Sequence, residues 1–569
     1  MIESVVVADI GSVLTKTSLL ASVDGHLRVL AASQVASTVT LPRPDVMSGL
    51  REGIRQLEAF SGRRLLDRDF PLNPSQSDGN GVDHFIATSS AGQFLTLLVL
   101  VADQGTPVSR AVTTTLSRVL SIPVLQEVLA LGENSPLTAA EALRWQSTPV
   151  DAILLVPPEK TSKGNTNRIN DMVQFLTSTT RRHGASRLPL FFLGDQQRLE
   201  SLNLLASEDL AWQPLATPGE LLASTLATLA QHLGVTYHNA QQRLVPGLQP
   251  LAEYLAVPLQ PSSQALGMAA EFLARSHSYT LVANVGATTT ATVSSDGATL
   301  EWGICAGLGT GYGATSLIDA VGINEVMRWL PYQTTPDHVM EAIFNRSIRP
   351  ASLSTTIDEL QLDYALATEA IRVALSPRDR AATFAKLDTV VAAGGVFRNA
   401  PSRAHVVFSL LSALQPVGRT LLLLDQFGIL EPLGTLSQHE PAVVRHLLHH
   451  EGLETLGTSI CVGGKGKEGD PAVQVTVLDG RDAGHARTVH LGSMLVLPVP
   501  TGTSITLELK PLGRFTIGLR PGEGARAEAL EGGTVGVIID ARPRPLTLPA
   551  RVSERIARLT QWLDALHAY

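Results

Sequence analysis

The residues best suited to chemistry lie near the start of the chain, in the segment Asp9-Ile10-Gly11-Ser12. A phosphate group is bound by backbone N–H groups that converge on it, and a tight glycine turn presents such groups. Ser12 and Thr15 add hydroxyl groups and Lys16 adds a cation, while Asp9 is placed to hold the hydrated Mg²⁺ of a nucleotide. On this segment alone, an ordinary hairpin whose aspartate caps a turn explains the pattern equally well.

Two later segments favour the nucleotide interpretation. The segment Val285–Thr290 is a second small-residue turn, in which Gly286, Thr288 and Thr289 repeat the glycine and hydroxyl pattern. Two such hairpins that face each other across a cleft can hold the β- and γ-phosphates from both sides. A buried strand then ends in Gly394-Gly395, where an adenine or ribose can lie directly on the backbone.

The elements that must position these residues also occur twice. Apolar runs at 4–10, 13–21 and 26–33 predict a three-stranded meander, and helical spacing follows at 44–63. A polar loop at 67–83 and a buried strand at 84–89 complete this part. The helix at 263–276 and the strands at 279–285 and 290–295 begin a second cycle about 270 residues later, so we expect two lobes.

The middle and the end of the chain differ from these lobes. Strand-like runs at 151–156 and 188–193 alternate with helical runs at 136–145, 167–182 and 219–233, which indicates α/β layering with a partly parallel sheet. After a linker at 462–471, short alternating runs at 472–478, 486–498, 503–510 and 514–519 predict a small antiparallel β domain. An amphipathic helix at 551–567 ends the chain.

Composition excludes several classes of protein. The chain has 569 residues, 44% apolar and 17% charged, as in a folded globular protein of several domains. A net charge of −8 and 5% aromatic residues argue against nucleic-acid binding. Two cysteines build no disulfide framework, and the start of the sequence lacks a basic signal-peptide region. The longest apolar run, 94–102, is about half the ~20 residues of a membrane span, so we expect a cytoplasmic protein without a transmembrane segment.

The order of the three glycine segments resembles the superfamily of sugar kinases, heat-shock chaperones and actin. Within it, the sequence is most similar to glutamate mutase L, the accessory proteins of B12-dependent glutamate mutase. The matching segments, over roughly residues 1–460, are Asp9–Lys16, Ala87–Gly92, Val285–Thr289, Ala393–Val396 and the glycine-bearing run 307–312. The resemblance implies an α/β fold of two actin-like (ribonuclease H-like) lobes with a nucleotide cleft. The antiparallel β domain after residue 470 lies outside it.

Three departures from the family pattern bear on catalysis. The second phosphate loop of these proteins begins and ends with aspartate, but Asn284 and Thr290 occupy these positions here. An amide lacks the charge that orients Mg²⁺-bound water, so Mg²⁺ binding should be weakened or lost. The glycine-rich stretch after the central strand is replaced by a segment with Pro157-Pro158, and proline donates no N–H group to an anion. We therefore expect slow hydrolysis or none, and assign no catalytic residue.

Two functions remain open at this point. The first is an ATP-binding accessory factor that couples nucleotide state to lobe closure and acts on a protein partner, which by resemblance is a B12-dependent mutase. The second is a degenerate actin-like scaffold that serves an assembly complex without ATP turnover. A sugar kinase is a poorer third, since no aspartate with a substrate pocket is evident.

The predicted site and domains follow from these arguments. ATP or ADP with Mg²⁺ is the expected cofactor, with Asp9 as the metal-binding residue. The predicted domains are a first lobe (1–262) with an inserted α/β region at about 125–240, a second lobe (263–461), the β domain (470–548) and the last helix (551–569). The predicted nucleotide-binding residues are Asp9, Gly11, Ser12, Thr15, Lys16, Gly286, Thr288, Thr289, Gly394 and Gly395.

Other candidate sites have simpler explanations. The segment Gly309–Ala314 fits a loose GxGxxA dinucleotide pattern but lacks a clear strand–turn–helix context. The segment Gly464–Lys467 lacks the hydroxyl residue and spacing of a P-loop and is typical of a linker. Cys305 is typical of a buried apolar position. A solvated helix face explains the three histidines, and ordinary strand ends explain the two carboxylates; these residues are His446, His449, His450, Glu301 and Asp195.

Overall fold

The structure is a computed structural model that describes most of the chain. The described residues are 3–40, 44–67, 72–101, 107–130, 150–156, 188–193, 210–215, 222–375, 387–479, 483–518 and 526–567. Contacts divide them into two compact units, one formed by residues 1–91 and 245–569 and the other by residues 92–244. We describe each unit by itself.

The first lobe of the larger unit is a five-stranded mixed sheet with the order β10-β4-β1-β2-β3. Its strands are β1 (Ser4–Ile10), β2 (Leu14–Val23), β3 (His26–Ala36), β4 (His84–Ser89) and β10 (Gln260–Pro261). β1 is buried along its whole length, pairs antiparallel with β2 and pairs parallel with β4. The predicted meander and the buried strand at 84–89 are therefore confirmed.

Helix α1 (Val46–Ser61) covers one face of this sheet. Asp45 caps its N-terminus by accepting a hydrogen bond from the Met47 N–H, and Gly62 ends it in the left-handed conformation. The apolar stripe of α1 includes Leu50, Ile54 and Leu57, which are fully buried against β1 and β2. The remaining short elements of this lobe are α7 (Leu248–Leu251) and η1 (Ala252–Tyr254).

The second lobe repeats this strand order within an eight-stranded sheet, β13-β12-β11-β14-β15-β16-β24-β20. β11 pairs antiparallel with β12 and parallel with β14, as β1 pairs with β2 and β4. The predicted duplication and the α/β fold of two actin-like lobes are confirmed. The strands of this half are β11 (Thr280–Val285), β12 (Thr289–Ser295), β13 (Leu300–Ala306), β14 (Thr389–Ala393), β15 (Gly418–Leu424) and β16 (Glu454–Cys461).

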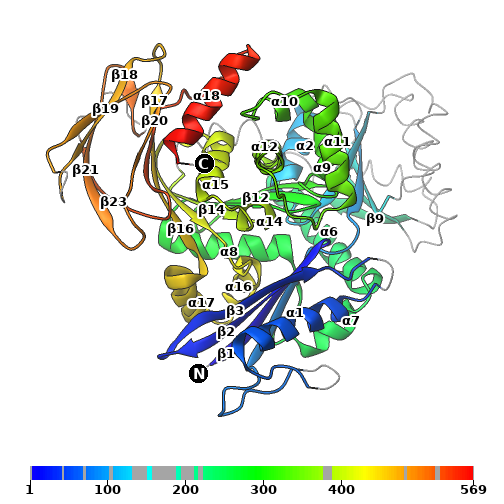
Figure 1. The fold of residues 1–569 in the computed structure, drawn as a ribbon. Coiled ribbons are helices and arrows are strands. Elements are labelled where there is room, and N and C mark those ends of the chain that lie inside the picture. The colour runs from blue at the N-terminus through cyan, green and yellow to red at the C-terminus, as the bar shows by residue number, and fades with distance from the viewer. Residues whose placement is uncertain are drawn as a thin grey trace. The chain divides into compact units, whose positions relative to one another are not determined.

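Two helices join the lobes through one continuous apolar core. α8 (Ser262–His277) and α16 (Leu430–Leu436) lie between the two sheets (Figure 1). The core includes Val5 and Ile86 from the first sheet and Val282 and Val391 from the second. The helices approach closely, because a Cβ atom at Gly434 would lie 2.1 Å from the Ala265 carbonyl oxygen. The lobes are therefore packed together through α8 and α16.

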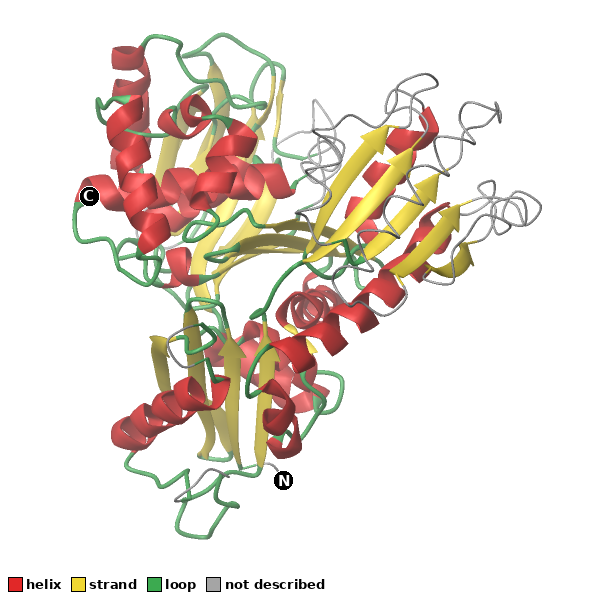
Figure 2. Cartoon of the chain, turned by 90° about the vertical axis from the view of Figure 1, so that its right-hand side faces the viewer, coloured by secondary structure: helices red, strands yellow, loops and turns green. Residues whose placement is uncertain are grey.

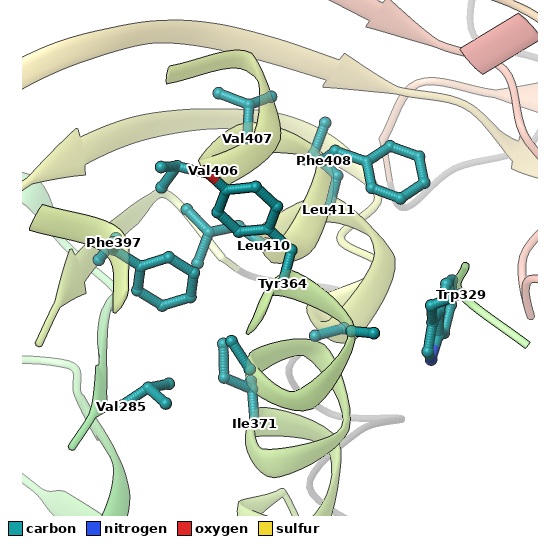
Figure 3. Packing of buried hydrophobic residues seen from close by; sticks show 14 of the residues in the cluster. Val285, Trp329, Tyr364, Ile371, Phe397, Val406, Val407, Phe408, Leu410 and Leu411 are labelled. Atoms are coloured by element: carbon teal, nitrogen blue, oxygen red, sulfur yellow. The ribbon is translucent and has the colours of Figure 1, made fainter. Parts of the chain in front are cut away.

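The other face of the second sheet carries a larger apolar cluster. Phe397, Tyr364 and Ile371 extend into this cluster together with Val285, the last residue of β11 (Figure 3). This packing fixes the strand end from which the second turn starts. The helices on this side and nearby are α9 (Ala314–Val321), α10 (Ile323–Met327), α11 (Pro336–Ile348), α12 (Ile357–Ala374), α14 (Gly395–Arg398) and α15 (Arg403–Leu414), with α17 (Pro441–Leu447) and the π-helix η2 (Leu448–Gly452) following α16.

The C-terminal region extends the second lobe. Two of its strands, β24 (Gly536–Asp540) and β20 (Met494–Leu497), join the eight-stranded sheet. A four-stranded antiparallel sheet is present as predicted, with the order β19-β18-β21-β23. Its strands are β18 (Pro471–Val477), β19 (Ala486–His490), β21 (Ser504–Pro511) and β23 (Arg526–Glu531), and β17 (Gly463–Gly464) pairs with β22 (Phe515–Thr516).

The last helix, α18 (Val552–Ala565), packs on α15 and on β20 of the eight-stranded sheet, and a buried arginine contributes to this packing. Arg542 is fully buried, with its guanidinium 5.3 Å from the Phe408 ring centroid and 5.1 Å from that of Trp562. Its Nη2 donates to Asp540 Oδ2 at 2.8 Å, and Arg544 reaches the same oxygen at 2.7 Å. Burial alone would raise the pKa of Asp540, but the two guanidinium groups outweigh it and lower the pKa. This ion network holds the end of the chain in place.

The smaller unit contains a parallel sheet with the order β6-β5-β7-β8-β9 (Figure 2). Its strands are β5 (Leu95–Val101), β6 (Val124–Ala130), β7 (Ala152–Val156), β8 (Leu188–Leu193) and β9 (Leu210–Leu215), with α2 (Pro107–Val119) and α6 (Leu222–Leu244). The predicted strands at 151–156 and 188–193 are confirmed, and all neighbouring pairs are parallel. The predicted helices at 136–145 and 167–182 lie outside the described residues. Among the described helices, none has the length and apolarity to cross a membrane.

Candidate functional site

The turn between β1 and β2 is closed by its own backbone. The Gly11 N–H donates to the Leu14 carbonyl oxygen at 2.9 Å. A Cβ atom at Gly11 would lie 2.7 Å from that oxygen, so only glycine fits without widening the turn. Ser12 follows at the tip and is partly exposed. The backbone thus presents Ser12 at the end of the strand pair.

The turn between β11 and β12 has the same construction. The Gly286 N–H donates to the Thr289 carbonyl oxygen at 2.9 Å, and a Cβ atom at Gly286 would lie 2.9 Å from that oxygen. Thr288 takes the place of Ser12 near the tip. Gly286 and Gly11 therefore have the same local role in the two hairpins.

The glycine-rich segment 307–313 supports this second turn. The Thr310 N–H donates to the Gly286 carbonyl oxygen at 3.0 Å, and the N–H groups of Gly311 and Gly313 donate to the Ala287 carbonyl oxygen at 3.0 and 2.9 Å. These N–H groups are therefore already engaged by the protein. The GxGxxA-like pattern is explained by support of the turn, without a dinucleotide.

The two turns meet directly. Ser12 Oγ and Thr288 Oγ1 lie 3.1 Å apart and share a hydrogen bond. The structure therefore brings together the residues that the sequence predicted on both sides of a phosphate site. It also leaves no space for a phosphate group between these two hydroxyls, because each would need its own hydrogen bond to a phosphate oxygen.

Asp9 lies beside this contact with both carboxylate oxygens engaged. Oδ2 accepts from Lys16 Nζ at 3.0 Å, while Oδ1 accepts from Ser262 Oγ at 2.7 Å and Thr88 Oγ1 at 3.1 Å. Burial of the ammonium alone would lower the pKa of Lys16, but the charges of Asp9 and Glu431 outweigh it and raise the pKa. The Lys16 ammonium therefore stays protonated at neutral pH.

Glu431 is the main site residue that the sequence did not reveal. Its Oε1 accepts from Asn284 Nδ2 at 2.6 Å, and the residue is only 2% exposed. Its Oε2 is buried and has no hydrogen-bond partner among the described residues. Burial, the charge of Asp9 and then that of Asp425 raise the pKa of Glu431 to about 8, despite the opposing charge of Lys16. A carboxyl group thus contacts Asn284, the position where the family pattern has aspartate.

Arg398 and Asp425 complete a buried group of charges. Asp425 accepts hydrogen bonds from the N–H groups of Gly428 and Ile429 at 2.9 and 3.1 Å, which positions the start of α16. Arg398 Nη1 donates to the Phe427 carbonyl oxygen at 3.3 Å. Burial lowers the pKa of the Arg398 guanidinium, although Asp425 and Asp9 oppose that effect. The helix that carries Glu431 is therefore held at its start by the side chain of Asp425.

The two glycines after β14 differ in function. Gly394 has φ of +100°, and a Cβ atom there would lie 2.1 Å from the Val285 carbonyl oxygen. It is required by the packing of β14 on β11. At Gly395 the nearest atom to an added Cβ is 4.0 Å away, on Asn399. Only Gly395 has the open surroundings that the nucleoside prediction needs.

The structure does not bring Thr15 to the other predicted residues. Thr15 is 1% exposed, and a Cβ atom at Gly49 of α1 would lie 3.4 Å from its Oγ1. Its side chain thus faces α1, on the opposite side of β2 from Lys16. Strand alternation gives the signal for this, since neighbouring residues point to opposite faces. Thr289 is partly buried at the start of β12, and Thr290 is completely buried.

The minor candidates gain no support as sites. Burial raises the pKa of Cys305 to about 12, so its thiol stays protonated. Glu301 is exposed on β13. The His446 ring stacks on His26 with 4.3 Å between centroids, and no cluster of metal-ligating side chains occurs among the described residues. The side chains of His449 and His450, and the residues Pro157, Pro158 and Asp195, lie outside the described part of the structure.

The comparison with protein families decides the relationship. The family model described as MutL protein matches residues 5–188 and 230–451, which include both turns, Gly394-Gly395 and Glu431. The chain belongs to the MutL protein family. The resemblance to glutamate mutase L is thereby confirmed. The sequence matches none of the curated proteins with which it was compared.

Solved structures similar to this MutL family member are distant. Nucleotide-free acetone carboxylase has 10% identity and a TM-score of 0.32, with 86% of this chain and 81% of that chain covered. Gluconate kinase from Lactobacillus acidophilus has 10% identity and a TM-score of 0.30, with 78% and 92% covered. The activator of 2-hydroxyisocaproyl-CoA dehydratase from Clostridium difficile, with bound ADPNP, has 10% identity and a TM-score of 0.28, with 78% and 96% covered. Scores this low carry no argument about function.

The residues present fit a nucleotide with a divalent cation only after rearrangement. Mg²⁺ prefers oxygen ligands, and the carboxylates of Asp9 and Glu431 are the acidic donors next to the turns. Lys16, however, already neutralises Asp9 at 3.0 Å. The orphaned Oε2 of Glu431 is a buried acceptor that a cation or a donor can satisfy. A cation therefore fits this donor set once Lys16 has left Asp9.

Proposed function

We propose that this MutL family member is a nucleotide-binding accessory factor that transmits its nucleotide state to a protein partner. The observation that carries the proposal is the contact between two equivalent glycine turns, with 3.1 Å between Ser12 Oγ and Thr288 Oγ1. Lys16 supplies a cation beside this contact, and Gly395 supplies open backbone nearby. Ser12, Lys16, Gly286, Thr288 and Thr289 would hold the phosphates, and Gly395 would accommodate the nucleoside.

Nucleotide binding at this position requires the two turns to separate. A phosphate group between Ser12 and Thr288 would accept a hydrogen bond of about 2.7 Å from each hydroxyl. The two hydroxyl oxygens, now 3.1 Å apart, must therefore separate to admit it. The turns belong to different lobes, so their separation changes how the lobes meet. Nucleotide binding is in this way coupled to the position of the lobes. It can shift the equilibrium between touching and separated turns by at most the difference in binding free energy of the nucleotide for these two states.

Lys16 is the side chain that would change partner. In this structure its ammonium neutralises Asp9. Phosphate oxygens would compete for the ammonium, and Asp9 and Glu431 would then hold a divalent cation. A bound Mg²⁺ would neutralise phosphate charge. Because Asn284 and Thr290 place no aspartate at the second turn, we expect ATP to be bound with little or no hydrolysis.

Calorimetry tests the proposal directly. We expect the wild-type protein to bind ATP with Mg²⁺, and Asp9→Asn to weaken binding at least tenfold, because it removes a carboxylate that would hold the divalent cation. Asp337→Ala, at an exposed position in the first turn of α11, is the matched control and should bind as the wild type does. No binding by the wild type at millimolar ATP would contradict the proposal. Unchanged affinity in Asp9→Asn would place the nucleotide elsewhere.

A scaffold without nucleotide is the second candidate. Its support is that Ser12–Thr288 and Asn284–Glu431 already satisfy one another without a ligand. In either case we propose a protein partner in the cytoplasm. By resemblance, a B12-dependent mutase is the first partner to test and an assembly complex the second. Co-purification with the mutase in the presence and absence of ATP separates the two, since only the accessory factor should respond to nucleotide.

A further inference from the structure

A pocket on the first lobe is lined by four arginines and is not used by the proposed nucleotide site. Its volume is about 880 Å³, and it lies beside the C-terminal half of α1 and the loop that follows. Arg51 and Arg55 come from α1, one helical turn apart, and Arg63 and Arg64 come from the loop. We call this the arginine pocket. α1 covers the face of the first sheet opposite to α8 and α16, so the pocket is separate from the two turns.

The acidic residues of the pocket are committed to building the loop. Glu58 Oε1 accepts from the N–H groups of Leu65 and Leu66 at 2.7 and 2.9 Å. Asp78 accepts from Asn80 through Oδ1 at 3.0 Å and Oδ2 at 2.7 Å, and hydrogen bonds from the Asn80 backbone and side chain lower its pKa. Asp67, the third acid, also has a partner of its own. The lining thus carries four arginines and three acids, and among the described residues Glu58 and Asp78 bond to backbone and amide groups instead of pairing with the four arginines.

The four arginines have no ion-pair partner among the described residues. Within the described ranges of the chain, none of the four forms a salt bridge with a carboxylate, and Arg51 Nε is shielded from solvent without a hydrogen-bond partner. Guanidinium groups that are unpaired in a concave surface repel one another, and an anion with several oxygens relieves that repulsion.

The backbone at Arg64 is hydrogen-bonded to residues 80 and 81. The Arg64 N–H donates to Asn80 Oδ1 at 2.7 Å, and the Gly81 N–H donates to the Arg64 carbonyl oxygen at 2.8 Å. Gly81 has φ of +75°, and a Cβ atom there would lie 1.9 Å from the Pro74 carbonyl oxygen. The backbone beneath the two arginines is thus preorganised for a ligand.

We propose that the arginine pocket binds a small anion with two or more phosphate groups. Guanidinium groups pair with phosphate through two parallel hydrogen bonds, so the four arginines offer donors for more than one phosphate group. The volume lies in the range of small-molecule sites, about 300–1,000 Å³. Among the residues that the structure describes, Ala59 and Leu66 are the apolar side chains of the lining and no aromatic ring belongs to it. The pocket therefore recognises phosphate groups and not a nucleobase.

Binding of inorganic tripolyphosphate, measured by calorimetry and by hydrogen–deuterium exchange, tests this site. We expect saturable binding with protection of peptides from residues 62–82. Arg51→Gln with Arg63→Gln should weaken binding at least about tenfold, since each removes a charged hydrogen-bond donor. The matched control is Arg445→Gln with Arg487→Gln, two exposed arginines outside the pocket. It should bind as the wild type does, and equal melting temperatures show that both variants fold.

A second arm uses ATP to separate the sources of phosphate. Protection of residues 62–82 by ATP and tripolyphosphate alike, retained in Lys16→Gln, supports a phosphate site independent of the turns. Protection by ATP alone would contradict recognition of phosphate groups. No saturable binding of tripolyphosphate up to about 1 mM, binding unaffected by the arginine substitutions, or protection confined to the two turns would each overturn the proposal.

Discussion

The two hairpin turns of this protein have the same backbone and different chemistry. Each is closed by a glycine N–H that donates across the turn at 2.9 Å. At the first turn, Asp9 and Lys16 form an ion pair at 3.0 Å. At the second, Asn284 contacts Glu431, a carboxyl group contributed by a helix 147 residues further along the chain. The two turns thus share one backbone arrangement, while the carboxyl group at the second turn comes from a distant helix.

This difference separates two requirements of a phosphate site. The glycines are required by contacts within each hairpin, so they persist whether or not a nucleotide is hydrolysed. The acidic residues would contact the ligand or the cation. They are not required by contacts within the hairpin, so a different position for them leaves the turn intact. The two turns of this MutL family member therefore share their backbone geometry and differ in the polar and charged groups beside them.

Substitution of the turn glycines should have a large effect on stability that is present at every pH. Gly11→Ala and Gly286→Ala each place a Cβ atom within 3 Å of a carbonyl oxygen of the same turn, and we expect each to cost about 1–3 kcal/mol of unfolding free energy. Chemical denaturation measures this. Gly395→Ala, with its open surroundings, is the matched control and should fold normally while weakening ATP binding. A cost at only one of the two turns would show that their backbones are not equivalent.

The carboxyl group of Glu431 at the second turn should make the free energy of unfolding depend on pH. The pKa of Glu431 is raised to about 8 in the folded state, so the folded state holds a proton that the unfolded chain releases near pH 4.5. Stability from this group is fully present below pH 4.5 and is lost as the pH rises through 8. Glu431→Gln should remove that loss, which amounts to at most ~1.4 kcal/mol per pH unit.

Denaturation at pH 5 and pH 9, without nucleotide or divalent cations, measures the effect of Glu431. Wild type and Glu431→Gln should be similar at pH 5, and the variant should be the more stable at pH 9. Glu253→Gln, at an exposed position, is the control and should follow the wild type. An equal pH dependence in wild type and Glu431→Gln would show that the carboxyl group at the second turn is charged throughout.

The direct contact between the turns should give the smallest effect. A double-mutant cycle with Ser12→Ala and Thr288→Ala should yield a coupling free energy of about 0.5–1.5 kcal/mol, the usual contribution of one hydrogen bond. Thr289→Ala in place of Thr288→Ala should give a coupling near zero. Saturating ATP should abolish the Ser12–Thr288 coupling if the turns separate on binding. Coupling that survives ATP would contradict that movement.

Much of the fold was predictable because its signals are local. The strands at 4–10 and 84–89 and the repeat near 280–295 follow from apolar runs and turn residues close together in sequence. The inserted region was less readable, since buried parallel strands lack alternation. The bounds of about 125 and 240 predicted for this region stay predictions. The compact unit that the contacts define spans residues 92–244. The two strands of the C-terminal region that join the second sheet carried no local signal of that pairing.

The sequence by itself determined the two glycine turns, the duplication and the family, because a tight turn limits which residues can occupy it. Thr15 was predicted from the motif, and strand alternation places its side chain on the opposite face of β2 from Lys16. Tertiary structure decided which groups surround Asp9 and Asn284. Thr88, Ser262 and Glu431 come from distant segments and meet there only because α8 and α16 pack between the two sheets. Convergence of this kind depends on packing in three dimensions, which no local pattern encodes.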